Sequence, residues 1–268
     1  MVRARPGVAG VSTERPLPTF SGFRLEGRRA LITGGSRGLG LASAAALAQA
    51  GARVTLASRS ANDLEVACSA IQAQGGSADC LVLDVTDASA VQSALRQRPP
   101  FQILVNNAGM NRPKPLIETP DEDIDAVLAL NVKAAFYVAR EVARTLLAAK
   151  LPGSIINVSS QMGQVGSPRR TLYCASKHAI EGMTKALAWE LGASAIRVNT
   201  LCPTFIETEL TAPMFEDRKF REFVLERIAL GRLGRLDEVM GPVVFLASDA
   251  SSLMTGSALM LDGGWTAA

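Results

Sequence analysis

The stretch ALITGGSRGLGLA, residues 30–42, decides how this chain folds. A short apolar run leads into Gly34, Gly38 and Gly40, and an alanine-rich stretch follows them directly. Glycine tolerates positive φ and lets its backbone approach another group closely. The first turn of a helix presents free N–H groups and the positive end of the helix dipole. A glycine-rich turn between a strand and a helix therefore predicts a binding site for the diphosphate of a dinucleotide.

The rest of the chain repeats this alternation of strand and helix. Short apolar runs, typical of strands, occupy residues 28–34, 52–58, 78–86, 102–109, 153–160, 196–203 and 257–264. Helical patterns occupy residues 39–51, 61–76, 120–148, 173–192 and 236–248, and the second opens with an Asn/Asp capping signal. Strands that are apolar throughout belong to a parallel sheet with helices on both faces. We therefore predict an α/β protein with a single-domain Rossmann fold, a seven-stranded parallel sheet doubly wound by helices.

The domain organisation is simple, because no internal repeat or linker divides the chain. We predict one catalytic domain over residues 23–268. Residues 203–235 break the alternation beside the carboxyl ends of the strands, which predicts a substrate-lid insertion. Residues 1–22 are rich in Pro, Gly and Arg, which favours a disordered or loosely docked tail over the alternative, an organelle transit peptide.

Composition argues against several classes of function. The net charge of +3 is no signature of nucleic-acid binding, and no stretch approaches the length of a membrane span. The four cysteines are scattered without a C-x-x-C pair, so we expect no zinc site, no other metal and no disulfide framework, and a cytoplasmic location. His178 is the one histidine, which argues against Ser-His-Asp hydrolysis.

Several motifs follow the glycine turn in a fixed order. They are LDVTD at 83–87, NNAG at 106–109, Asn131, NVSS at 157–160, Y-x-x-x-K at 173–177 and RVNTLCP at 197–203. With the T-G-x-x-x-G-x-G turn itself, this series resembles the short-chain dehydrogenase/reductase family over about residues 24–268. The resemblance implies an enzyme that interconverts a small-molecule ketone and a secondary alcohol by hydride transfer to or from a nicotinamide cofactor.

Tyr173 and Lys177 are the expected centre of the chemistry. Positions i and i+4 of a helix share a face, and a nearby cation stabilises a phenolate. The resemblance assigns Tyr173 as the general acid/base, with Lys177 lowering its pKa and binding the nicotinamide ribose. It assigns Ser160, rather than Ser159, to the substrate oxygen. It gives Asn131 a place in a proton relay to the lysine.

The end of the second strand suggests which cofactor is bound. Ser58 and Arg59 stand where an acidic side chain would select a ribose 2′-hydroxyl, and Arg37 can approach the same point. Two guanidinium groups suit a phosphate, so we predict NADP(H) over NAD(H), although both arginines could be plain surface residues. The full set of predicted cofactor contacts is Gly34, Ser36, Arg37, Gly38, Leu39, Gly40, Ser58, Arg59, Asp84, Val85, Asn107, Ala108, Gly109, Tyr173, Lys177, Pro203, Ile206 and Thr208. The chain departs from the family pattern at Thr204, where a glycine usually follows the proline.

The substrate is the open question. Arg112, Lys114, Arg169 and Arg170 could give the pocket mouth a positive potential that favours an anion, and Gln161 is a further candidate contact. The stretches NNAGMNRPKP and DGGW are similar to members that act as gluconate 5-dehydrogenase, which suggests a sugar acid or polyol. A 3-oxoacyl-[acyl-carrier-protein] reductase is the alternative, and a non-catalytic NADP(H) sensor a less favoured one. We expect a homotetramer, or a homodimer, formed through the long helices.

Overall fold

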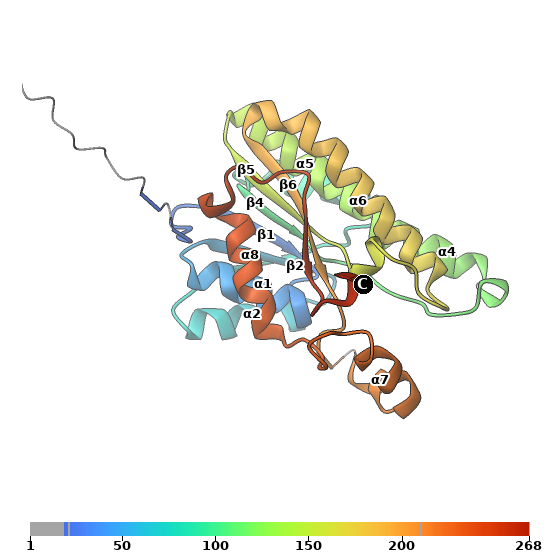
Figure 1. The fold of residues 1–268 in the computed structure, drawn as a ribbon. Helices are drawn as coiled ribbons and strands as arrows, with labels where there is room; N and C mark the ends of the chain where they lie inside the picture. Colours follow the sequence, from blue (N-terminus) through green and yellow to red (C-terminus); the bar gives the residue numbers. More distant parts are fainter. Residues whose placement is uncertain (1–18, 21, 210, 268) are drawn as a thin grey trace, which may run out of the picture.

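The computed structural model describes residues 19–20, 22–209 and 211–267, so most of the predicted tail lies outside the described residues (Figure 1). Its centre is one seven-stranded sheet in which every paired neighbour is parallel, in the order β3-β2-β1-β4-β5-β6-β7. The strands are β1 Arg29–Thr33, β2 Arg53–Ser58, β3 Ser77–Val82, β4 Ile103–Asn106, β5 Gly153–Val158, β6 Ile196–Pro203 and β7 Ala258–Leu261. This confirms the predicted sheet.

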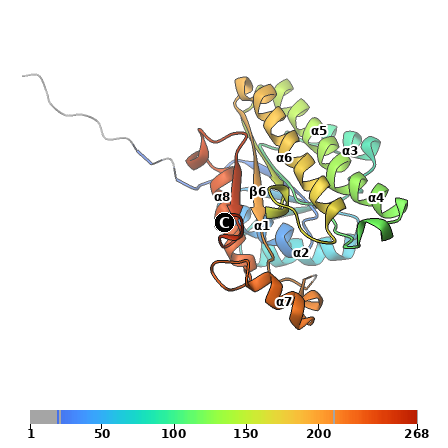
Figure 2. The same ribbon diagram turned by 45° about the vertical axis from the view of Figure 1, so that its right-hand side comes forward.

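Helices cover both faces of the sheet, as expected for a doubly wound fold (Figures 1 and 2). They are α1 Gly38–Gln49, α2 Ala61–Ala73, α3 Ala88–Arg96, α4 Asp121–Leu128, α5 Ala134–Ala149, α6 Thr171–Leu191, α7 Arg218–Leu225 and α8 Leu236–Ala247. One core packs α1, α2 and α8 on the sheet, and a second packs α3, α5 and α6 on the other face. The strand order reverses between β1 and β4, and a crevice at such a point is where open α/β sheets bind ligands.

The sequence pattern did not predict α3, and for α2, which begins at residue 61 as predicted, it indicated the wrong capping residue. Only Val91 and Leu95 of α3 are buried, so its apolar stripe is too sparse to see, although the Asp87 carboxylate caps it by accepting from two backbone N–H groups. The cap of α2 is Ser60, whose hydroxyl accepts from the N–H of Asp63 at 3.3 Å, and not the Asn/Asp pair that follows it.

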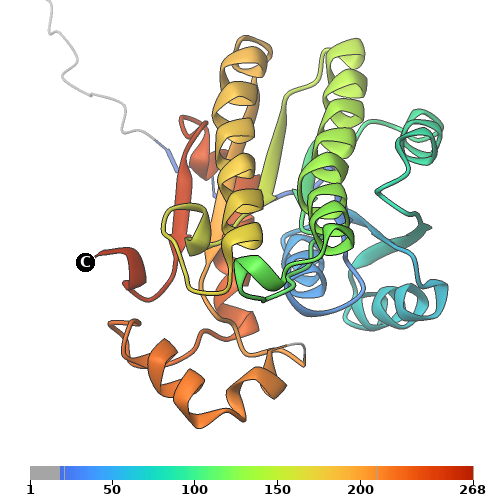
Figure 3. The ribbon, with the colours of Figure 1, turned by 90° about the vertical axis from the view of Figure 1, so that its right-hand side faces the viewer.

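The long helical stretch 120–148 is interrupted. A π-helical turn, Ala129–Lys133, separates α4 from α5. Such wide turns contain i→i+5 hydrogen bonds and occur often at functional sites. Figure 3 shows α5 and α6 side by side on the sheet, and Asn131 of the π turn meets α6 through Ser176.

The segment 203–235 leaves the sheet at the end of β6 and carries α7 away from the main body (Figure 1). It has a small apolar core of its own, formed by Val224, Ile228 and Leu233. Trp265 packs on this core, with its ring centroid 6.0 Å from that of Phe205. The C-terminal Trp265 therefore packs within its own chain. Among the described residues, no helix is long and apolar enough to cross a membrane.

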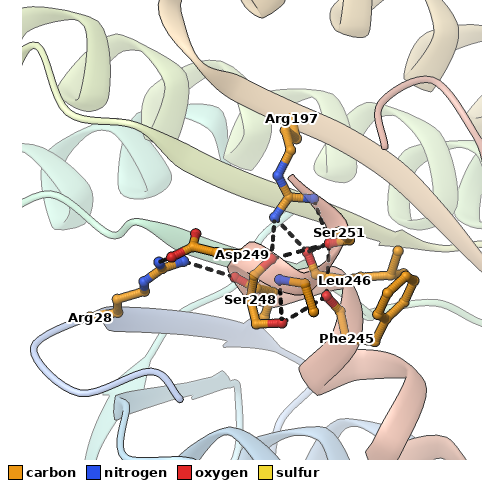
Figure 4. A network of polar contacts seen from close by, with 9 residues as sticks. Arg28, Arg197, Phe245, Leu246, Ser248, Asp249 and Ser251 are labelled. Carbon is orange, nitrogen blue, oxygen red and sulfur yellow. Dashed lines mark hydrogen bonds and ion pairs between the residues drawn. The ribbon is translucent and has the colours of Figure 1, made fainter. Parts of the chain in front are cut away.

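Figure 4 shows a polar network that fixes the C-terminal end of α8. The network lies where β6 begins, whereas the glycine turn follows the carboxyl end of β1, so the two are at opposite ends of the sheet. The guanidinium of Arg197, on β6, donates to the carbonyls of Leu246 and Ser248 at 2.8 and 3.1 Å and to the Ser251 hydroxyl at 2.8 Å. Arg28 pairs with Asp249 at 2.6 Å beside it. A guanidinium that satisfies the last carbonyls of a helix also complements its dipole.

Replacing Arg197 with methionine should lower the free energy of unfolding by about 2–4 kcal/mol, because partly buried carbonyls would lose their donors. The matched control is Arg24→Met, whose ion pair with Glu26 is exposed and should change the free energy of unfolding little. Urea unfolding followed by circular dichroism measures both. Equal losses in the two variants would contradict the assigned role of Arg197.

Candidate active site

The glycine turn has a backbone that favours glycine at Gly34 and no room for a side chain at Gly40. Gly34 has φ +63°, and a Cβ on Gly40 would collide with the Gly34 carbonyl and lie 2.6 Å from Asn107 Nδ2. No side chain caps the N-terminus of α1, and its first turn holds no acidic residue. The free N–H groups and the helix dipole therefore suit an anion. These features fit the diphosphate of a dinucleotide.

Asn107 and Ala108, two of the predicted cofactor contacts, hold the glycine turn in place by hydrogen bonds from the end of β4. The backbone N–H groups of Asn107 and Ala108 donate to the Thr33 hydroxyl at 3.0 and 3.1 Å. The Asn107 amide donates to the carbonyls of Thr33 and Gly34 at 3.0 and 3.1 Å. The side chain of Asn107 therefore ties β4 to the glycine turn, and Gly109 is the exposed member of the motif.

Arg37 and Arg59 are both exposed near the turn. In the part of the chain that the structure describes, neither guanidinium takes part in an ion pair or a side-chain hydrogen bond. The neighbouring Asp84 accepts from the N–H and hydroxyl of Thr86, which lower its pKa, and Arg59 adds a smaller effect in the same direction. The two cations are thus available to a phosphate, and the residues present fit an NADP(H) molecule.

Ser160, Tyr173 and Lys177 come together at the end of β5. The Ser160 hydroxyl donates to Gln161 Oε1 at 2.7 Å and accepts from the Met162 N–H at 3.1 Å. Lys177 Nζ lies 5.5 Å from the centre of the Tyr173 ring and donates to the Val158 carbonyl at 2.8 Å. The three residues predicted from the sequence are therefore brought together, and the side chain of Gln161 fixes the Ser160 hydroxyl by accepting its hydrogen bond.

Burial acts on the pKa of both Tyr173 and Lys177. Burial raises the pKa of Tyr173 to about 12, while a hydrogen bond with Ser160 acts in the opposite direction. Burial lowers the pKa of Lys177 to about 8, opposed by Cys202 and Glu181. Desolvation of the phenolate is the largest cause of the raised pKa of Tyr173, and the charge of Arg170 acts in the opposite direction with a smaller effect. At neutral pH the phenol keeps its proton and the lysine keeps its charge.

Asn131 links three segments around this triad. Its Nδ2 donates to the Met110 carbonyl at 2.9 Å and to the Ser176 hydroxyl at 3.0 Å, and its Oδ1 accepts from the Met110 N–H at 2.8 Å. Both ends of the amide are thus engaged, and the π turn is fastened to the loop after β4 and to α6. Asn131 is 2% exposed, so it is no surface helix residue.

A buried polar cluster behind Lys177 was not predicted. Glu181 is 5% exposed and accepts from the Thr200 hydroxyl at 3.0 Å and the Cys202 thiol at 3.3 Å. Burial raises the pKa of Cys202 to about 12, so the thiol keeps its proton. The sequence did indicate that Glu181 lies near Lys177, because it follows the lysine by four residues and so shares its helix face.

The candidate substrate pocket opens between the start of α6 and the segment 203–235, with a volume of about 420 Å³. Aromatic and aliphatic side chains line it together with charged ones: Pro113, Ser167, Pro168, Arg169, Arg170, Phe205, Met214, Asp217, Lys219, Phe220 and Phe223. Arg169 is exposed with φ +60°, whereas Arg170 is buried. Gln161 is 1% exposed and lies behind Ser160.

The predicted positive mouth is only partly present. Arg112 and Lys114 both pair with Asp123, at 3.0 and 2.7 Å, in a separate hollow. The Asp123 carboxylate comes from α4 and neutralises one of the two charges. The positive potential at the substrate pocket therefore rests on Arg169, Arg170 and Lys219 rather than on the residues after β4.

Three of the predicted cofactor contacts, Pro203, Ile206 and Thr208, lie at the end of β6 or just after it. Pro203 and Ile206 are buried, and the Pro203 carbonyl lies 3.5 Å from Ser160 Oγ. The Thr204 hydroxyl, where a glycine was expected, is buried without a partner among the described residues. The N–H and hydroxyl of Thr208 are both engaged by Thr211 within their own turn.

The chain is similar to known proteins in both sequence and structure. The chain matches the family described as enoyl-(acyl carrier protein) reductase over residues 34–266. It is 39% identical to D-erythrulose reductase of Gallus gallus over 89% of this chain and 96% of that protein. It is 40% identical to gluconate 5-dehydrogenase of Gluconobacter oxydans (strain 621H), over 91% and 96% of the two chains.

Two further matches bear on the site. The 3-oxoacyl-[acyl-carrier-protein] reductase FabG of Thermotoga maritima is 41% identical over 90% of this chain and 99% of that protein. The crystal structure of a gluconate 5-dehydrogenase from Burkholderia cenocepacia J2315, in complex with NADP and tartrate, superposes with a TM-score of 0.89. It is 37% identical over 92% of this chain and 98% of that chain.

Proposed function

Since this chain belongs to the short-chain dehydrogenase/reductase family, whose enzymes act on CH–OH groups, we propose that it interconverts a ketone and a secondary alcohol with NADP(H). The observation that carries the proposal is the meeting of Ser160, Tyr173 and Lys177 after the carboxyl end of β5, at the sheet edge where β1 leads into the glycine turn. Tyr173 follows the pocket-lining Arg170 by three residues. The named activities of the relatives favour a polyhydroxylated substrate, such as a sugar acid or ketose.

The mechanism assigns one task to each residue. When bound, the nicotinamide supplies or accepts the hydride at the substrate carbon. Tyr173 holds its proton at neutral pH and donates it to the oxygen as negative charge develops there. The Ser160 hydroxyl orients that oxygen. The ammonium of Lys177 stabilises the phenolate that remains, and Asn131 keeps the π turn in place beside the pair.

Binding of the cofactor is assigned to the glycine turn and the second strand. The N–H groups at the start of α1 would hold the diphosphate, and Arg37 and Arg59 the 2′-phosphate. Asp84, Val85 and the NNAG segment would border the adenosine, and Ile206 and Thr208 the nicotinamide end. The NADP bound to the gluconate 5-dehydrogenase of B. cenocepacia supports this cofactor.

Replacing Arg37 and Arg59 together with serine should reduce the preference for NADPH over NADH, measured as the ratio of kcat/KM, by roughly 100-fold. Each charged hydrogen bond to phosphate is worth about 1.5–3 kcal/mol, and a ribose hydroxyl gains nothing from the guanidinium groups. The matched control is Arg53→Ser, an exposed arginine at the opposite end of β2. A wild-type preference for NADH, or an unchanged ratio in the double variant, would refute the cofactor assignment.

A second candidate substrate class has support of its own. The 41% identity to a 3-oxoacyl-[acyl-carrier-protein] reductase, with the apolar Phe205, Phe220 and Phe223 in the pocket, favours an acyl thioester. A panel of keto-gluconates, neutral ketoses and a 3-oxoacyl thioester, read by NADPH absorbance, separates the two. Tight NADP(H) binding without turnover of any compound would instead favour a non-catalytic sensor.

We also propose a homotetramer or homodimer in which α5 and α6 take part. Trp189 on α6 is 90% exposed and Phe136 on α5 is 49% exposed, so these helices offer apolar surface.

A further inference from the structure

Arg170 is a buried cation without a counter-charge. It is 7% exposed and stands directly before the first residue of α6. Within the described part of the chain its guanidinium forms no ion pair, and its Nε atom is buried without any hydrogen-bond partner. Arginine cannot shed its proton at physiological pH. A buried charge of this kind is costly unless a partner arrives.

The contrast with Arg197 shows that the fold can satisfy a buried guanidinium when stability requires it. Arg197 donates to three backbone carbonyls and one hydroxyl. Arg170 has one favourable contact, the ring of Phe220, whose centre lies 6.0 Å from its Cζ. This contact covers one face of the guanidinium and leaves its N–H edge for a ligand.

Among the described residues that line the pocket beside Arg170, none forms an ion pair with its guanidinium. The single acidic residue in its lining is Asp217, and its Oδ1 accepts from the N–H groups of Lys219 and Phe220 as the cap of α7. Phe205, Phe220 and Phe223 make the rest of the wall apolar. A low-polarity wall strengthens any charge pair formed inside it.

Arg170 stands close to the reacting group along the chain. It is the residue before α6, and Tyr173 lies in the first turn of that helix, three residues later. A guanidinium that lines the pocket and a phenol at the same end of α6 can therefore meet two groups of one substrate molecule.

Resting on the function proposed above, we propose that Arg170 binds a carboxylate of the substrate, and that the substrates are keto acids and hydroxy acids. Planar guanidinium and carboxylate groups match in a bidentate pair. Arg170 is then a specificity-determining residue, and Tyr173 and Ser160 act on the carbonyl.

The test uses two ketones that differ at one end. 5-Keto-D-gluconate carries a carboxylate where L-sorbose carries a hydroxymethyl group, and the remaining carbons match. Wild type should show a kcat/KM at least about 100-fold higher for the keto acid, since a desolvated pair of this kind contributes several kcal/mol. Arg170→Met should lose about 100-fold with 5-keto-D-gluconate and less than about threefold with L-sorbose. Arg170→Lys should recover part of the loss.

Two measurements keep the inference separate from the proposed function. The Kd of NADP+ should be unchanged in Arg170→Met, which shows that the fold and cofactor site are intact. Arg218→Met removes an exposed charge from α7 and should leave both substrates unaffected. Turnover of L-sorbose or acetoacetyl-CoA equal to that of the keto acid, and insensitive to Arg170→Met, would overturn the inference and leave the proposed function standing. Absence of turnover with every ketone would overturn both.

Discussion

Tyr173→Phe should lower kcat for ketone reduction by about a thousandfold or more, because it removes the one hydroxyl placed to protonate the developing alkoxide. The ring remains, so its packing near Lys177 and the fold should be kept. NADPH absorbance measures the turnover. The Kd of NADP+, measured by protein fluorescence, should change less than about threefold.

The chain supplies a matched control for this substitution. Its only other tyrosine is Tyr137, on α5, which packs with Arg140 away from the pocket. Tyr137→Phe should leave kcat unchanged. Near-normal turnover in Tyr173→Phe, or equal losses in the two variants, would rule out Tyr173 as the general acid.

Gly40→Ala should weaken NADP(H) binding by at least about 100-fold. The added methyl group would collide with the Gly34 carbonyl and the Asn107 amide, so either the turn opens or α1 shifts. Both changes move the N–H groups that would hold the diphosphate, and well-packed backbone gives way only at a cost of about 1–3 kcal/mol. Titration of NADP+ by isothermal calorimetry measures the loss directly.

Gly182→Ala is the control for this change. Gly182 lies inside α6 with no atom within 4 Å of an added Cβ, so alanine should stabilise the helix by about 0.5–1 kcal/mol and leave NADP+ binding alone. If Gly40→Ala binds NADP+ as tightly as wild type, the diphosphate does not occupy the glycine turn.

The sheet and the reacting groups were predictable because local patterns encode them. Apolar runs mark parallel strands, and a spacing of four places Tyr173 and Lys177 on one face. The α3 helix was not predicted because only two of its side chains, Val91 and Leu95, are buried. The π turn was not predicted because one additional residue in a helix does not visibly change the spacing of apolar residues.

Charge pairing was the least predictable property. Whether an arginine is neutralised depends on contacts that the fold creates. Asp123 on α4 pairs with both Arg112 and Lys114, whereas no carboxylate among the described residues pairs with Arg170. Four basic residues that looked equivalent in the sequence therefore differ in what they offer a substrate. The effect of burial on the pKa of Tyr173 could not be predicted for the same reason, since burial depends on the whole structure.

The π turn at 129–133 has a consequence for chain length. Hydrogen bonds fix the turn at two places. Within it, Asn131 is bonded to the backbone of Met110. Just after it, the carbonyl of Ala135 accepts from the side-chain amide of Asn106 at 3.1 Å. Each residue of a helix advances it by about 100°. Deleting one residue here would make an unbroken α-helix and rotate α4 by more than a quarter of a turn against α5. The two anchors would then face different directions, so this stretch can change in composition but hardly in length.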